Sequence, residues 1–150
     1  MAPTHHFEVH ASWRSDGGGM PPGNHRLEFE GKAPIEASAA PQYKGDPSRS
    51  NPEELFVASL ASCQMLSYLA LAARGGVTVL AYDDRAQGTL TIADKKMRFT
   101  EVVLRPRITI AAGSDEAKAR ALVHAAHEAC FIANSVACEV RAEPEIFVGA

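Results

Sequence analysis

The sequence predicts an α+β fold in the order β-β-(β)-α-β-β-α-β, with mainly antiparallel strands around a long buried helix. The central helix is expected over 51–76, the longest apolar stretch of the chain. Residues 77–110 alternate between apolar and polar side chains, which is typical of strands. Ser114 is a good N-cap for a second helix over 114–129, and a last strand is expected over 138–147.

The N-terminal part is expected to be a small β-sheet. Apolar and polar residues alternate over 7–13 and again over 25–29, with Gly- and Pro-rich chain breakers over 15–23 between them. A short third strand is expected near Ile35. The segment 38–50 is rich in Pro, Gly, Ser and Asp, which indicates an ordered loop leading into the central helix.

The central helix has clear start and stop signals. Asn51 is a favourable N-cap, Pro52 suits the first helical position, and Glu54 stands at the capping-box position. Gly75 and Gly76 are expected to end the helix. Because apolar residues occupy nearly every face between these signals, the helix is expected to be buried on all sides by its own domain or by a partner chain.

The two segments after this helix predict a long β-hairpin. Alternation over 77–92 and over 98–110 gives two strands of similar length, with a polar turn between them. Asp83 and Asp84 indicate a bulge or a bend in the first strand. Pro106 lacks a backbone N–H, which predicts an edge strand or a bulge in the second.

Composition describes one domain, 1–150, of an ordinary globular protein. The chain is 46% hydrophobic with a net charge of −3, and no basic cluster indicates nucleic-acid binding. The polar N-terminus lacks the apolar core of a signal peptide, so a cytoplasmic location is expected. Two glutamates at the start of the central helix and several polar residues within it argue against a membrane span.

Three cysteines without an export signal do not form a disulfide framework, which leaves catalysis, redox chemistry or inert packing. Cys63 lies in the central helix and Cys130 follows the second helix. If both helices pack on one sheet, the two thiols could meet and cycle between thiolate, sulfenic acid and disulfide. The alternative is that both are buried structural cysteines. Cys138 is interpreted as a packing residue.

A reactive Cys63 would need a cation or a dipole to stabilise its thiolate. Lys44, Arg49 and Arg14 are the candidate cations, and Glu53 could orient an arginine through a bidentate ion pair. Ten helical residues separate Glu53 from Cys63, or about 15 Å along the axis. Glu53 would therefore act from a second chain or through a bridging side chain, unless it is a surface acid favoured by the helix dipole.

A metal site is a further alternative. His124, His127 and Cys130 recur at every third residue and could present ligands on one side of a helix. No fourth ligand is obvious, so a metal is not expected.

Two motifs resemble those of a known family. The segment NPEELFVASLASCQM closely resembles the first cysteine motif of the OsmC/Ohr family of thiol peroxidases, and ACFIANSV resembles its second cysteine motif. The order and the separation of the two motifs fit the family. The resemblance covers nearly the whole chain. GDPS before NPEEL, together with CFIANSV, is closest to a less characterised OsmC-like branch.

The resemblance implies an OsmC-like fold and an intertwined homodimer whose active sites use both chains. It implies that Cys63 is the peroxidatic thiol, Cys130 the resolving thiol and Glu53 the helix-start glutamate of the family. The implied substrates are organic hydroperoxides and the implied reductant is a dithiol such as a lipoyl group, with no metal or flavin. The family's arginine has no clean counterpart here. The alternative function is a non-enzymatic dimeric protein that binds a small apolar or thiol-reactive ligand.

Overall fold

The structure is a computed structural model that describes residues 2–15, 17 and 23–149. The chain forms two compact units, Met1–Leu55 and Phe56–Ala150, and we describe each by itself. The boundary falls within the first turn of the central helix, so the candidate Glu53 belongs to the first unit while Cys63 and Cys130 belong to the second.

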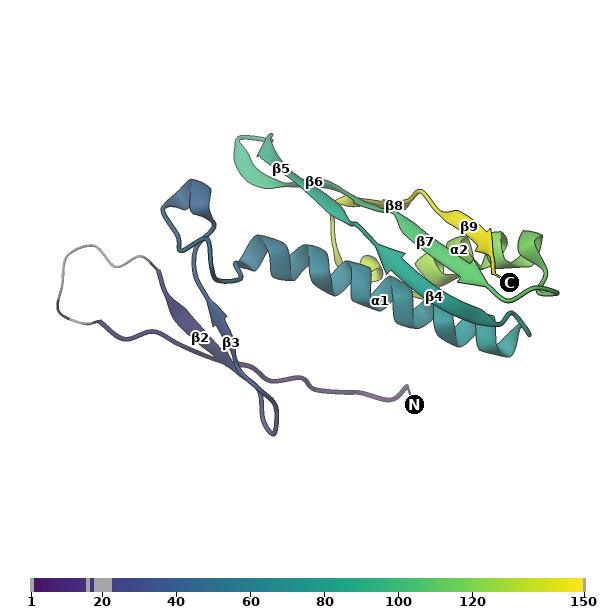
Figure 1. Ribbon diagram of the computed structural model, residues 1–150. Helices are drawn as coiled ribbons and strands as arrows, with labels where there is room; N and C mark the ends of the chain where they lie inside the picture. Colours follow the sequence, from purple (N-terminus) through teal and green to yellow (C-terminus); the bar gives the residue numbers. More distant parts are fainter. Residues whose placement is uncertain (1, 16, 18–22, 150) are drawn as a thin grey trace. The chain divides into compact units, whose positions relative to one another are not determined.

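The first unit contains a three-stranded antiparallel sheet, in the order β1-β2-β3 (Figure 1). The strands are β1 His10–Ser12, β2 His25–Glu28 and β3 Ile35–Ala37, so the third strand that Ile35 suggested is present. β1 is shorter than the alternating pattern predicted, because Phe7 and Val9 lie outside it and are exposed. The predicted break over 15–23 lies mostly outside the described residues.

The loop that leads into the central helix is ordered, as predicted. It contains the short 3-10 helix η1 Pro41–Tyr43, followed by Lys44 in a left-handed conformation with φ 64°. A Cβ atom on Gly45 would lie 1.6 Å from the carbonyl oxygen of Ala39, so this close approach of the backbone requires glycine. The backbone N–H of Ser38 donates to the carbonyl of Ser50 at 2.8 Å, which closes the loop just before the helix starts.

The central helix α1, Pro52–Arg74, begins and ends as the sequence predicts. The side-chain oxygen of Asn51 accepts a hydrogen bond from the backbone N–H of Glu54 at 2.9 Å, which satisfies one of the free donors of the first turn. At the other end Gly76 has φ 73°, and the N–H of Val77 donates to the carbonyl of Ala72 at 2.9 Å. This left-handed glycine closes the helix.

In the part of the chain that the structure describes, full burial of α1 is confined to one face, so its own domain does not bury the helix on all sides. The buried residues recur every four positions: Leu60, Gln64, Tyr68 and Ala72. Leu66 is 64% exposed on another face. By length and composition α1 could cross a membrane, with a mean hydropathy of 1.7, and 22% of that window is buried. A core helix of a soluble protein meets the same criteria.

The predicted long hairpin is present in the second unit, but each of its arms breaks into two strands. The strands are β4 Val79–Asp84, β5 Gln87–Ala93, β6 Lys96–Leu104 and β7 Pro106–Ile110. β5 pairs with β6 and β4 pairs with β7, both antiparallel, so the arms stay paired across the break (Figure 1). The carboxylate of Asp84 bridges the break by accepting from the backbone N–H of Arg105 at 2.7 Å.

Pro106 does not mark an edge strand. β7 is the middle strand of the sheet β4-β7-β9, and Pro106 is its first residue. The missing N–H is tolerated there because the ladder is already interrupted at Arg105. The alternation over 98–110 places five residues on one face, and all five are buried: Val102, Leu104, Pro106, Ile108 and Ile110.

The last helix and strands also differ in detail from the prediction. The helix α2, Glu116–Ala129, is capped by Asp115 rather than Ser114, because the Asp115 carboxylate accepts from the N–H of Lys118 at 3.0 Å. The predicted last strand is two strands, β8 Glu139–Ala142 and β9 Glu145–Val148. They run parallel to β6 and β7, which gives the observed order β-β-β-α-β-β-β-β-α-β-β.

Both helices of the second unit pack on the sheets and on each other. Gln64 and Tyr68 of α1 donate side-chain hydrogen bonds to the α2 carbonyls of Val123 and Ala119, at 3.0 and 2.9 Å. The later α1 residue, Tyr68, contacts the earlier α2 residue, Ala119, so the two helices run antiparallel. Small residues of α2, with Ala119 and Ala126 fully buried, allow this close packing. The arrangement brings the C-terminal end of α2 to the body of α1.

Candidate functional site

Cys63 lies in the middle of α1 on a half-buried face. It directly precedes Gln64, which is buried and bonded to the carbonyl of Val123 on α2. Ser67 stands one turn later, at the i+4 position, where its hydroxyl can reach the Cys63 sulfur. The thiol therefore sits at the border between the core and the exposed part of α1.

Cys130 is the C-cap of α2 and is 1% exposed. Its backbone N–H donates to the carbonyl of His127 at 3.2 Å, and its sulfur accepts from the backbone N–H of Ala133 at 3.4 Å. The chain then turns through the 3-10 helix η2, Ala133–Ser135. This tight turn directs the backbone N–H groups of the residues after Cys130 towards the two sulfurs.

The structure brings the two thiols together, with a hydrogen bond between them, and both are free thiols. Burial alone would raise the pKa of the Cys63 thiol. Hydrogen bonds from the backbone N–H of Ile132, the thiol of Cys130, the N–H of Phe131 and the hydroxyl of Ser67 outweigh burial and lower that pKa below its usual value. Donors from one unit thus stabilise the Cys63 thiolate.

The pKa of Cys130 moves in the opposite direction. Burial raises the pKa of this thiol to about 11, and the neighbouring Cys63 adds to the increase, because a second negative charge would lie beside the first. Of the two thiols, Cys63 therefore loses its proton first, and Cys130 stays protonated at neutral pH. A cysteine that ionises readily beside a protonated thiol is the arrangement that sulfenic acid and disulfide chemistry needs.

The candidate cations and Glu53 all lie in the first unit. The Arg49 guanidinium pairs with Glu36 at 3.1 Å and with Asp46 at 3.5 Å. Arg14 donates to the carbonyl of Trp13 at 3.0 Å, and Lys44 follows η1. One carboxylate oxygen of Glu53 is buried without a hydrogen-bond partner among the described residues, which is unusual for a surface acid.

The remaining candidates do not join the thiol pair. Cys138 is half-buried and packs with Val140 and Ile132 around the core residue Leu60, as its interpretation as a packing residue requires. His124 is exposed and pairs with Glu128 at 3.7 Å. Among the residues that the structure describes, no group of three or more His, Cys, Asp or Glu side chains could hold a metal ion.

Sequence reasoning missed some participants at this site. Ser67 had a visible signal, since a hydroxyl one helical turn after a cysteine lies beside it. The backbone donors of Phe131 and Ile132 had none, because every residue except proline carries an N–H. The half-buried residues Tyr82 and Asp84 on β4 were considered only as part of a strand with a bulge or a bend.

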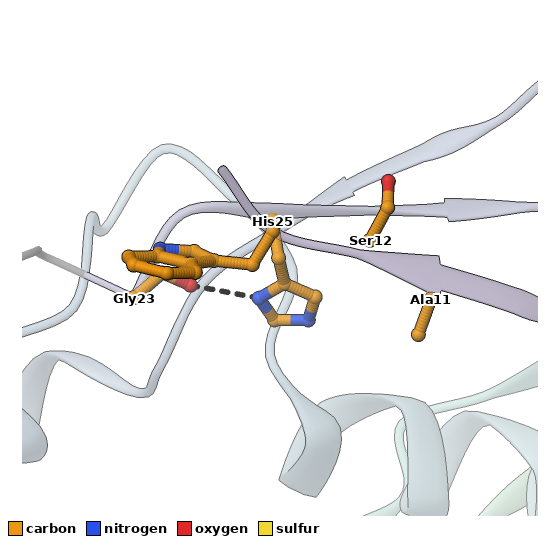
Figure 2. Close-up of a pocket in the computed structure, with 5 residues that line it drawn as sticks. Ala11, Ser12, Gly23 and His25 are labelled. Carbon is orange, nitrogen blue, oxygen red and sulfur yellow. Dashed lines mark hydrogen bonds between the residues drawn. The ribbon is translucent and has the colours of Figure 1, made fainter. Parts of the chain in front are cut away.

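A surface pocket lies in the first unit, and no cysteine is among its lining residues. Ala11, Ser12, Trp13, Gly23 and His25 line it, and the His25 ring makes a 2.7 Å hydrogen bond with the carbonyl of Gly23 (Figure 2). This hydrogen bond fixes the orientation of the imidazole in the pocket. The lining includes the Ser12 hydroxyl and the His25 imidazole but no carboxylate, and we assign this pocket no reaction.

Comparisons with known proteins agree with this fold. An OsmC-like protein of unknown function from Vibrio cholerae is 35% identical, with a TM-score of 0.87 over 95% of this chain and 100% of that chain. An organic hydroperoxide resistance protein from Elizabethkingia anophelis is 17% identical, with a TM-score of 0.74 over 99% and 100% of the two chains. At that identity the likeness shows the fold alone.

Sequence comparisons point the same way. The uncharacterized protein YmaD of Bacillus subtilis is 23% identical over 150 residues, which cover 96% of this chain and 95% of that protein. The sequence model of the OsmC-like protein family matches residues 45–145, which include α1, both cysteines of the pair and all the strands from β4 to β8. Since this match spans well over half of its length, the chain belongs to the OsmC-like protein family.

Proposed function

We propose that this protein is a thiol-dependent peroxidase that reduces organic hydroperoxides through Cys63. The observation that supports the proposal most strongly is the hydrogen-bonded pair of free thiols, one with a lowered pKa and the other with a raised pKa. A peroxide-reducing cysteine must be a thiolate at neutral pH, and its partner must be close enough to form a disulfide. Similarity in fold to organic hydroperoxide resistance proteins is consistent with this chemistry.

The reaction proceeds in three steps. The Cys63 thiolate attacks the distal peroxide oxygen, the O–O bond breaks, and an alkoxide leaves and takes a proton from solvent to form the alcohol. The Cys130 thiol then attacks the sulfur of the Cys63 sulfenic acid, and the departing hydroxide takes the thiol proton and leaves as water. An external dithiol, such as a lipoyl group, reduces the resulting disulfide and is itself oxidised to a disulfide.

We further propose that the whole chain, 1–150, works as a single OsmC-like domain in an intertwined homodimer. The large apolar side chains on the uncovered part of α1, such as Leu66 and Leu69, are suited to a partner helix. Glu53 would then serve the Cys63 site of the second copy, because about 15 Å of helix separates these two residues within one chain. Its unpaired buried carboxylate oxygen is free to orient a cation there.

The proposed location is the cytoplasm, where the reducing environment keeps such a pair as thiols. Neither a metal nor a flavin takes part in the proposed reaction.

A steady-state assay tests the proposal with cumene hydroperoxide as the oxidant and dihydrolipoamide as the reductant. The variant Cys63→Ser is expected to lose peroxide consumption entirely. The variant Cys130→Ser keeps a hydroxyl beside Cys63 and is expected to consume one equivalent of peroxide and stop, with a sulfenic acid at Cys63 that dimedone traps. Unchanged turnover in Cys63→Ser would refute the proposal, and saturable ligand binding without turnover would favour a binding protein instead.

A further inference from the structure

A polar amide lies on the buried face that α1 turns towards α2. Gln64 is 1% exposed, and the other buried residues of this face are Leu60, Tyr68 and Ala72. The Nε2 atom of Gln64 donates to the α2 carbonyl of Val123 at 3.0 Å, while its Oε1 atom has no hydrogen-bond partner among the described residues. Because an apolar side chain would avoid burying an unpaired amide oxygen, the glutamine calls for an explanation other than stability.

The bond to Val123 is not needed to satisfy the backbone of α2. Val123 lies inside this helix, where its carbonyl already has the N–H of His127 as a partner. The buried residues of α2 are small, Ala119, Val123 and Ala126, and their shallow ridges restrain sliding along α1 only weakly. A hydrogen bond holds its two atoms at a set distance and angle. The Gln64 amide therefore helps to fix the register of α2 on α1, a known use of single buried polar groups.

This register matters because two contacts with the α2 segment lie on either side of Cys63 along α1. The residue after Cys63 is the glutamine that bonds to α2. Three residues before Cys63, Leu60 belongs to the core cluster against which Ile132 and Ala133 of the following turn pack. That turn continues directly from Cys130, the C-cap of α2, whose sulfur accepts from the N–H of Ala133 at 3.4 Å. The position of α2 thus decides where the second thiol and its turn meet α1.

We propose that Gln64 is a positioning residue, which holds Cys130 and the turn after it in register with Cys63 through its bond to Val123. About two turns of helix carry the position of Val123 to Cys130. Without the Gln64 amide, the remaining bond between the helices is at Ala119, about three turns from Cys130, so the C-terminal end of α2 can swing. The inference rests on the proposed function for its purpose, since a resolving thiol must reach the peroxidatic sulfur.

The variant that tests this role is Gln64→Met, which keeps a long unbranched side chain but has no amide to donate. Its free energy of unfolding should be no lower than that of the wild type, because the change removes a buried oxygen without a partner and the Val123 carbonyl keeps its bond within α2. Gln64→Leu is a second apolar variant. Urea unfolding of both variants identifies the conditions under which each is folded.

The first measurement is the closure of the disulfide between Cys63 and Cys130 by diamide, which needs no peroxide. The Cys63 thiolate adds to one azo nitrogen, and the other takes a proton from solvent. The Cys130 thiol then attacks the Cys63 sulfur, the sulfur–nitrogen bond breaks, and the hydrazine leaves with the thiol proton. In excess diamide this second step is first order. Quenched-flow alkylation should show it slowed at least about 10-fold in Gln64→Met, since a misplacement of about 1 Å can cost about 100-fold.

The second measurement is the pH dependence of the alkylation of Cys63 by iodoacetamide. In the wild type the backbone N–H groups of Phe131 and Ile132 help to lower the pKa of this thiol. A shift of α2 displaces these donors, so the midpoint of the profile should move to higher pH in Gln64→Met. A residue that served folding alone would change the stability of the protein without moving this midpoint.

Tyr68→Phe is the matched control. It removes the other hydrogen bond between the helices, from the Tyr68 hydroxyl to the Ala119 carbonyl at 2.9 Å, one turn further from Cys63. Its ring stays packed beside Tyr82, so both measurements should match the wild type. Wild-type results for Gln64→Met, or equal losses in Gln64→Met and Tyr68→Phe, would overturn the role of Gln64 and leave the proposed peroxidase untouched. Losses in Gln64→Met alone, with no peroxide turnover in the wild type, would support this role and refute the peroxidase.

Discussion

Cys63 and Cys130 share a hydrogen bond and yet have opposite surroundings. Cys63 lies on the side of a helix, half-buried, and receives hydrogen bonds from two backbone N–H groups, a thiol and a hydroxyl. Cys130 lies at the C-terminal end of a helix, almost fully buried, with Cys63 as a competing acid beside it. The difference shows that the number of donors decides which thiol ionises, since burial raises the pKa of both.

The position of each sulfur therefore decides its role in the pair: Cys63 ionises more readily and Cys130 keeps its proton. The turn after α2 supplies the N–H groups of Phe131 and Ile132 to Cys63 and that of Ala133 to Cys130. One short segment thus serves both thiols but favours the charge on Cys63. A substitution that shifts this turn would weaken the contrast without altering either cysteine.

The largest expected effect is on alkylation. With a pKa of about 11, Cys130 is about one part in 10,000 thiolate at pH 7, and it is also inaccessible. Cys63 should react with iodoacetamide at least about 100-fold faster than Cys130 at pH 7, as measured by mass spectrometry of the alkylated peptides.

The contrast in alkylation should disappear in urea, where the two thiols have similar surroundings. Cys138, which is half-buried like Cys63 but lies outside the pair, shows how much exposure alone contributes. Equal alkylation rates at Cys63 and Cys130 in the folded protein would contradict the assigned charge distribution.

A smaller effect is expected when single donors to Cys63 are removed. Cys130→Ala deletes a thiol donor and should raise the pKa of Cys63, which the pH dependence of its alkylation measures. Ser67→Ala should raise the same pKa by less, because the Ser67 hydroxyl contributes the weakest of the four hydrogen bonds. A larger shift in Ser67→Ala than in Cys130→Ala would reverse this ranking.

Much of this site follows from the sequence, because helix signals and apolar periodicity are local. Asn51 caps α1 and Gly76 ends it, as the sequence indicates. These two signals alone therefore place Cys63 in the middle of the helix. The meeting of Cys63 with Cys130 needed only that both helices pack on one sheet, which the core cluster that joins α1, α2 and β7 confirms.

The strand breaks are only partly indicated by the sequence, since Asp83, Asp84 and Pro106 predict a bulge or a bend but not a division of each arm into two strands. Alternation continues from Leu104 through Pro106 without a change of face, so periodicity gives no sign that the ladder is interrupted at Arg105. The N-cap at Asp115 instead of Ser114 is a choice between two adjacent residues with nearly equal capping ability. Long-range strand pairing decides where the strands break. A tertiary contact decides the N-cap, since the Ser114 hydroxyl instead accepts from the backbone N–H of Thr78.

The smallest expected effect is on stability at high pH. The pKa of Cys130 is about 11 in the folded protein against 9.0 for an ordinary thiol, so between these values the unfolded chain loses a proton that the folded chain keeps. The free energy of unfolding should therefore fall more steeply from pH 9 to 11 in the wild type than in Cys130→Ser, whose hydroxyl does not titrate. Cys63, with a lowered pKa, contributes a slope of the opposite sign near pH 9, where the unfolded chain still holds part of its proton, and this slope fades as the pH rises above 9. Urea unfolding at pH 8, 9, 10 and 11 measures the slopes, and parallel curves for the two proteins would show that folding does not raise the pKa of Cys130.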